Sequence, residues 1–136
     1  MSELENQLRA DLLKIGLNEN FKLSLRPYSK SYYGRYIPRS NTVIVYVNKS
    51  PNGEPYPYID LLLVVIHEVI HCMQWSRPNF KRIKGVMHNP EFKQLYGIYS
   101  NRAKALVLFR EVIKNYDTID KKRGRKVYNK PNRCGA

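Results

Sequence analysis

The chain has 136 residues, the length of a single domain, and its content of 43% hydrophobic and 12% aromatic residues excludes a disordered protein. It contains 24 Lys and Arg residues against 11 Asp and Glu residues, and the net charge of +13 favours polyanionic partners. Two cysteines, Cys72 and Cys134, are too few for a disulfide framework, and the first residues lack the apolar stretch of a secretion signal. We therefore expect an intracellular protein, cytoplasmic or nucleoid-associated, or located in the host cytoplasm if the chain is viral.

The first half of the chain shows a helical pattern and then strand-like patterns. Residues 2–17 place leucine and isoleucine at helical spacing, with Ser2 as the N-cap, and predict an amphipathic helix. Residues 21–48 contain three short runs rich in β-branched and aromatic residues, which predict a three-stranded antiparallel sheet. The prolines and the Asn-Gly pair of residues 49–58 indicate a loop.

The second half of the chain is predicted to be helical on either side of a basic connection. Residues 59–76 are mostly apolar, but no run of about 18 or more apolar residues occurs, so we expect a buried helix and no membrane span. After the basic residues 76–88, a second helix is predicted over 89–116, with Asn89 as N-cap and Pro90 at the first helical position. The expected fold class is α+β, with a small antiparallel sheet packed against an N-terminal helix and these two helices.

The C-terminal residues 121–136 differ from the rest of the chain in composition. Basic residues are frequent there and acidic residues are absent, while glycine and proline replace most apolar residues. We expect a domain over residues 1–120, followed by a tail that is unfolded when free. Such a tail can bind nucleic acid, or it can simply keep the protein soluble, and both readings stay open. The basic residues at its start are Lys121, Lys122, Arg123, Arg125 and Lys126.

The apolar helix contains three groups that resist burial, in the sequence HEVIH at His67–His71. Residues four apart lie on one helix face, with about 5–6 Å between their Cβ atoms, so both imidazoles can reach one metal ion. Glu68 follows the first histidine, where its carboxylate can deprotonate a water held by that ion. Random order would give this motif in only about a few per thousand chains of this composition. The motif therefore predicts a Zn²⁺ site with Glu68 as the catalytic base.

A catalytic zinc ion usually takes a third protein ligand. The metzincin pattern would place a histidine six residues after His71, but this chain has Arg77 there. The remaining histidine of the chain is His88, just before the N-cap of the following helix, and we expect it to be the third ligand. Glu91 is the alternative, although an acidic residue in a first helical turn is also explained by the helix dipole.

Two sequence features together resemble a known family. The motif HEVIH, followed after a basic loop by HNPEF at residues 88–92, resembles the SprT-like (Spartan-type) zinc metalloproteases, whose second motif reads His-Gly-Pro-Glu-Phe or close to it. The segment YGRYIPRSNTVIVYVNK, residues 33–49, also looks like that family's strand pair. The resemblance covers roughly residues 5–110. Asn89 replaces the family's usual glycine, and the cysteines do not support the zinc ribbon that some members carry.

The resemblance implies a zincin-like core in which the two helices carry the active site. It implies that zinc is bound by His67, His71 and His88 and that Glu68 is the catalytic base. In the best-known members the activity is cleavage of proteins that are bound or crosslinked to DNA. Any DNA contact of this chain would then come from the basic tail and from the surface of the core.

The predicted activity is that of a zinc metalloendopeptidase, with a protein or peptide as substrate. Tyr96 and Tyr99, on the helix after His88, are candidates for stabilising the oxyanion, and residues 28–36 are a candidate edge for pairing with the substrate backbone. Two other classes stay open. One is a non-proteolytic nucleic-acid-binding protein with a structural zinc, and the other is a zinc hydrolase of a non-protein substrate.

Overall fold

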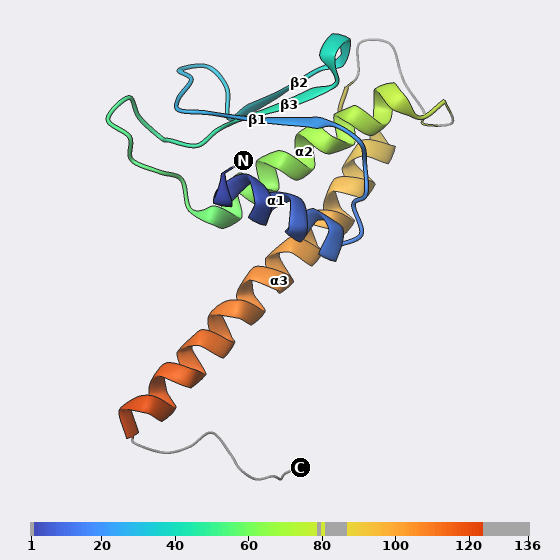
Figure 1. The fold of residues 1–136 in the computed structure, drawn as a ribbon. Helices are drawn as coiled ribbons and strands as arrows, with labels where there is room; N and C mark the ends of the chain where they lie inside the picture. Colours follow the sequence, from blue (N-terminus) through green and yellow to red (C-terminus); the bar gives the residue numbers. More distant parts are fainter. Residues whose placement is uncertain (1, 79, 81–86, 124–136) are drawn as a thin grey trace. The chain divides into compact units, whose positions relative to one another are not determined.

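The computed structural model describes residues 2–78, 80 and 87–123. Residues 1–104 form one compact unit, which contains all the strands and sites described below, and residues 105–136 form a second unit. The elements, in chain order and as labelled in Figure 1, are α1 (Glu3–Lys14), β1 (Lys22–Arg26), β2 (Gly34–Ile37), a 3₁₀ turn η1 (Pro38–Ser40), β3 (Thr42–Tyr46), α2 (Tyr58–Ser76) and α3 (Pro90–Arg123). The predicted α+β class, with a small sheet packed against helices, is confirmed.

Helix α2 is the central element of the core. Its most deeply buried side chains, each 0% exposed, are Leu62, Val65, Ile66, Val69, Ile70 and Cys72. Because valine and isoleucine are weak helix formers, burial against neighbouring elements stabilises this helix more than propensity does. By length and composition α2 could also cross a membrane, but 61% of its most apolar window is buried inside the fold, as in the core helix of a globular domain.

The sheet has the strand order β1–β3–β2, with the buried strand β3 in the middle. The β2–β3 pair is antiparallel, as predicted, but β1 and β3 are parallel, so the prediction of an all-antiparallel sheet was wrong. Val43, Ile44 and Val45, the apolar middle of β3, are all buried, and the strand is paired on both edges. Since β1 and β2 run in opposite directions on either side of β3, one of the two pairings has to be parallel.

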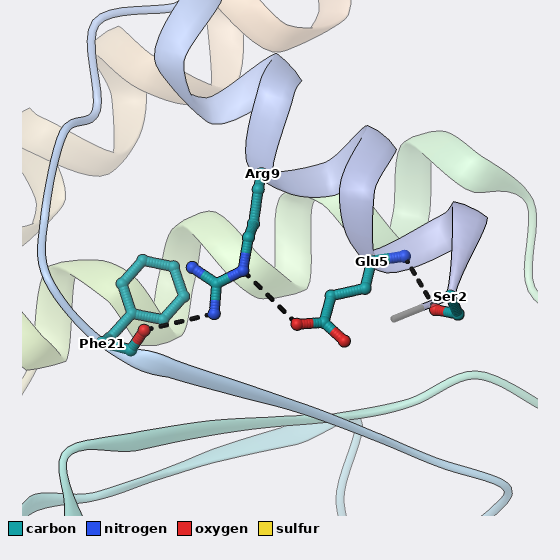
Figure 2. Close-up of polar contacts among 4 residues, drawn as sticks. All are labelled: Ser2, Glu5, Arg9 and Phe21. Atoms are coloured by element: carbon teal, nitrogen blue, oxygen red, sulfur yellow. Dashed lines mark hydrogen bonds and ion pairs between the residues drawn. The ribbon is translucent and has the colours of Figure 1, made fainter.

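Helix α1 is connected to the start of the sheet through the side chain of Arg9. Figure 2 shows that Ser2 caps the helix by accepting a hydrogen bond from the Glu5 N–H at 3.1 Å. Glu5 in turn accepts from Arg9 Nε at 3.4 Å, and Arg9 Nη2 donates to the Phe21 carbonyl at 3.3 Å. The chain entering β1 is therefore held against α1 by a charged group that also lies over the Phe21 ring.

Helix α3 begins as predicted and ends later. Asn89 Oδ1 accepts a hydrogen bond from the Phe92 N–H at 2.9 Å, which confirms Asn89 as the N-cap. The helix continues past the predicted end at residue 116 to Arg123, so the first three residues of the predicted unfolded tail are helical. The rest of that tail, residues 124–136, lies outside the described residues.

Gly34, the first residue of β2, lies directly against α2. A Cβ atom at this position would meet Val64 Cγ1 at 2.6 Å, the Ile44 carbonyl oxygen at 2.8 Å and Glu68 Cγ at 3.4 Å. The second of these contacts is with backbone, which cannot move aside as a side-chain end can. Glycine therefore allows the edge strand to approach the helix next to Glu68.

We expect Gly34→Ala to destabilise the domain by about 1–3 kcal/mol, because the added methyl group must push β2 away from α2. Gly97→Ala is the matched control, since a Cβ on this helical glycine meets nothing within 4 Å. The control should be stabilising by about 0.5–1 kcal/mol, the usual gain for this change inside a helix. Chemical unfolding of the two variants measures both effects. Equal stability of the two variants would show that the close approach at Gly34 is not a constraint.

Candidate metal centre

Helix α2 supplies two of the three clustered histidines. His67 and His71 lie one turn apart, and their ring centroids are 4.9 Å from each other. The segment before α3 supplies the third, His88, whose Nε2 lies 3.1 Å from His67 Nε2 and 3.2 Å from His71 Nε2. All three ligand atoms lie within 4.8 Å of one another. The structure thus brings together the three histidines that the sequence analysis singled out.

Phe92 packs beneath the three imidazoles. Its ring centroid lies 4.6 Å from that of His71, 4.8 Å from that of His88 and 4.9 Å from that of His67, and the residue is only 3% exposed. A planar apolar ring in contact with all three imidazoles limits their rotation and keeps water from that side. The sequence analysis included Phe92 in the motif HNPEF but gave its side chain no role in the site.

Gln74 connects the two parts of the chain that carry the histidines. His71 Nδ1 and Gln74 Oε1 are 2.6 Å apart, and Gln74 Nε2 donates to the Met87 carbonyl at 2.7 Å. The second bond fixes the orientation of the amide, because only its nitrogen can donate to a carbonyl. Gln74 Oε1 must therefore accept, so His71 Nδ1 carries the proton and His71 Nε2 presents a lone pair to the other histidines.

The two histidines of α2, His67 and His71, are held in the neutral form in which they can bind a metal. Burial, and the nearby rings of His71 and His88, lower the pKa of His67 to about 4. Burial also lowers the pKa of His71, against the opposing effect of its hydrogen bond to Gln74. Both imidazoles are consequently uncharged at neutral pH, with lone pairs available.

Glu68 is buried beside this cluster. Its residue is 9% exposed, and within the part of the chain that the structure describes no donor or cation contacts its carboxylate. Burial raises its pKa to about 7. The side chain lines an open cavity of about 310 Å³ together with His67, Tyr96, Tyr33, Gly34 and Val64.

The remaining sequence candidates are placed differently. Glu91, the alternative ligand, is not part of the histidine cluster and has an interaction of its own. Tyr96 lines the cavity that holds Glu68, and burial raises its pKa. Tyr99 does not line this cavity, and its ring is covered by the Arg102 guanidinium at 5.3 Å. Of the two tyrosines, only Tyr96 faces the site.

The donor set fits a small tetrahedral cation. With metal–nitrogen bonds of about 2.0–2.1 Å, tetrahedral geometry separates two ligand nitrogens by about 3.3 Å. The two Nε2 distances to His88, 3.1 and 3.2 Å, are close to this value. A cation bound there would also compensate the buried Glu68 carboxylate. The fold and the site together define an α+β domain with three histidines arranged as metal ligands beside a buried carboxylate.

Comparisons with known proteins do not place this chain in a family. No protein-family model matches this chain, and no curated protein matches it in sequence. Among solved structures it is similar to the "metallopeptidase zymogen of Pyrococcus abyssi abylysin", with 15% sequence identity and a TM-score of 0.47 over 92% of this chain and 99% of that chain. A likeness this distant carries no functional conclusion, and the SprT-like resemblance stays a prediction.

We expect Gln74→Ala to weaken zinc binding about 10–100-fold, because the substitution releases both the His71 ring and the Met87 carbonyl. Gln94→Ala, on an exposed position of α3, is the matched control and should leave the affinity unchanged. Gln74→Glu separates the two bonds, since it keeps an acceptor for His71 and loses the donor to Met87. Competition with a chromophoric chelator measures the affinity, and thermal unfolding of the metal-free proteins reports any loss of fold. An unchanged affinity in Gln74→Ala would contradict this role.

Proposed function

We propose that this protein is a zinc-dependent metallopeptidase. The observation that carries the proposal is the convergence of the Nε2 atoms of His67, His71 and His88 beside the buried Glu68 carboxylate, at an open cavity. Three imidazoles favour zinc among the common cellular metals, and three protein ligands leave a position for water or substrate. A purely structural zinc would usually have a fourth protein ligand, and the cluster contains none among the described residues.

A zinc ion bound at this site would lower the pKa of a water molecule and polarise the carbonyl group of the substrate. Side chains of the protein carry out the proton transfers and stabilise the oxyanion. Glu68 accepts the proton of the attacking water on its carboxylate and passes it to the nitrogen of the leaving amine. The raised pKa of Glu68, about 7, suits a group that must both accept and release a proton near neutral pH. Tyr96, in the same cavity, is the candidate for donating a hydrogen bond from its phenol to the developing oxyanion.

The substrate backbone is proposed to pair with the free edge of β2. Among the residues that the structure describes, β2 pairs with β3 alone, and its first residue, Gly34, lines the cavity that holds Glu68. An extended peptide added at this edge would pass in front of the histidines. Strand β2 overlaps the candidate segment 28–36 of the sequence analysis at residues 34–36.

Nucleic-acid-bound proteins are proposed as one class of substrate, on the strength of the basic composition and the SprT-like sequence motifs. The net charge of +13 favours association with nucleic acid. Residues 121–123 continue helix α3, and the basic residues beyond them lie outside the described part of the chain. An intracellular, reducing location belongs to the same proposal and agrees with the free thiol of the buried Cys72.

The proposal is tested by separating metal binding from hydrolysis. Glu68→Gln keeps the shape of the side chain and removes the base, so zinc content and fold should persist while hydrolysis falls by about two to four orders of magnitude. His88→Ala should lose zinc, whereas Glu91→Ala, the matched control three residues after the cluster's third histidine, should retain it.

Zinc is measured by elemental analysis of the purified proteins, and hydrolysis is measured on an unfolded protein such as denatured casein. Activity that persists in Glu68→Gln would exclude the proposed base. Zinc retained by His88→Ala and lost from Glu91→Ala would exclude the proposed ligand set.

A further inference from the structure

A second cavity of about 350 Å³ lies beside the one that holds Glu68. Its walls are three tyrosine rings and three aliphatic side chains, with one carboxylate, Asp60. The tyrosines come from the segment before β2, from β3 and from the loop before α2, so the cavity is formed only when these segments meet. They are Tyr33, Tyr46 and Tyr56, and the aliphatic residues are Leu61, Leu63 and Val64.

The two cavities adjoin, since Tyr33, Leu63 and Val64 line both of them. On α2, the positions Asp60, Val64 and Glu68 are spaced four apart and lie along one helix face. A ligand that reaches Glu68 along this face therefore meets the second cavity without crossing any other element.

The walls favour a large apolar guest. The rings of Tyr33 and Tyr56 meet edge to face, with centroids 5.8 Å apart at an interplanar angle of 64°, and form a corner of the cavity. Tyr33 is 66% exposed, which is unusual for an aromatic ring that lines two adjoining cavities. Asp60 is exposed and has no ion-pair partner among the described residues, so its charge disfavours an acidic guest.

We propose that this cavity is a specificity pocket that binds a bulky apolar, preferentially aromatic, side chain of the peptide substrate. The inference rests on the proposed peptidase function and adds a substrate preference to it. An aromatic side chain can stack against the tyrosine rings while Leu63 and Val64 cover its edges. An apolar side chain left in water loses this burial, so peptides that lack it bind more weakly.

The position of the pocket along α2 sets the position of the preferred residue. With a rise of 1.5 Å per residue, Val64 and Asp60 lie roughly 6 Å and 12 Å along the helix from Glu68. An extended peptide advances about 3.3 Å per residue, so a side chain that enters the middle of the pocket, roughly 9 Å along the helix from Glu68, lies about two or three residues from the scissile bond.

The first test maps cleavage sites. Zinc-loaded protein is incubated with denatured casein, and the products are identified by mass spectrometry. We expect Phe, Tyr, Leu or Met to be enriched at one position two or three residues from the cut, and quenched peptides with Phe there to be cleaved about tenfold or more faster than those with Ala. Tyr56→Ala should reduce this preference, whereas Tyr28→Ala, which does not line the pocket, should keep it. Cleavage without such enrichment, or with Lys and Arg enriched instead, would overturn the pocket and leave the peptidase function standing.

The second test does not depend on catalysis. The methyl signals of Leu61, Leu63 and Val64 are followed by NMR in the Glu68→Gln protein while N-acetyl-phenylalaninamide, N-acetyl-lysinamide or N-acetyl-aspartamide is added. The phenylalanine probe should shift these signals at concentrations about tenfold or more below those at which the other two act, and Tyr56→Ala should abolish the difference. Equal or tighter binding of the lysine probe would overturn the proposal. Selective binding of the phenylalanine probe, combined with no hydrolysis of casein by the zinc-loaded wild-type protein, would contradict the peptidase function and leave the pocket standing.

Discussion

Helix α2 has to be buried to hold its position, and it also has to carry three groups that resist burial. Its interior face supplies most of the apolar core, and its weak helix propensity means that packing maintains it. His67, Glu68 and His71 are therefore fixed by the same contacts that stabilise the domain. This arrangement holds the metal-binding side chains rigidly. It also disfavours their charged forms, because burial lowers the pKa of His67 and His71 and raises the pKa of Glu68.

The three Nε2 atoms of the histidine cluster cannot all be paired by hydrogen bonds among themselves. Gln74 fixes the proton of His71 on Nδ1, so its Nε2 can only accept. His88 Nε2 lies within 3.2 Å of two other ring nitrogens, and a single proton there can be donated to one of them at a time. Protonating all three rings would place like charges in a partly buried site. A shared cation removes the conflict, which is the physical reason to regard the cluster as a metal centre and not as a set of core histidines.

The parts of the fold and site that depend on local sequence could be predicted, and the parts that depend on tertiary neighbours could not. The spacing of HEVIH places His67 and His71 on one helix face in any context, and Asn89-Pro90 is a helix start by its own chemistry. Elimination among three histidines favoured His88 over Glu91, and the structure places His88 in the histidine cluster.

Gln74 gave no such signal, because its two bonds exist only when the segment at Met87 folds back over α2. The parallel pairing of β1 and β3 was missed for a related reason. The strand pattern of residues 21–48 indicates extended structure but does not say which strands are neighbours. The fully apolar run of β3 was the one clue that it would be central, since a strand covered on both faces reads as continuously hydrophobic.

Chemistry and recognition are linked through Val64 in the proposed enzyme. Val64 lies one turn of helix before Glu68 and lines both cavities. Its side chain occupies the space that a Cβ atom at Gly34 would need. A larger residue at either position would change the separation of β2 and α2. That separation sets both the width of the cleft in front of the histidines and the shape of the tyrosine-lined pocket. The side chain that the protein selects and the bond that it presents to Glu68 would therefore change together, because one helix face and one edge strand define both.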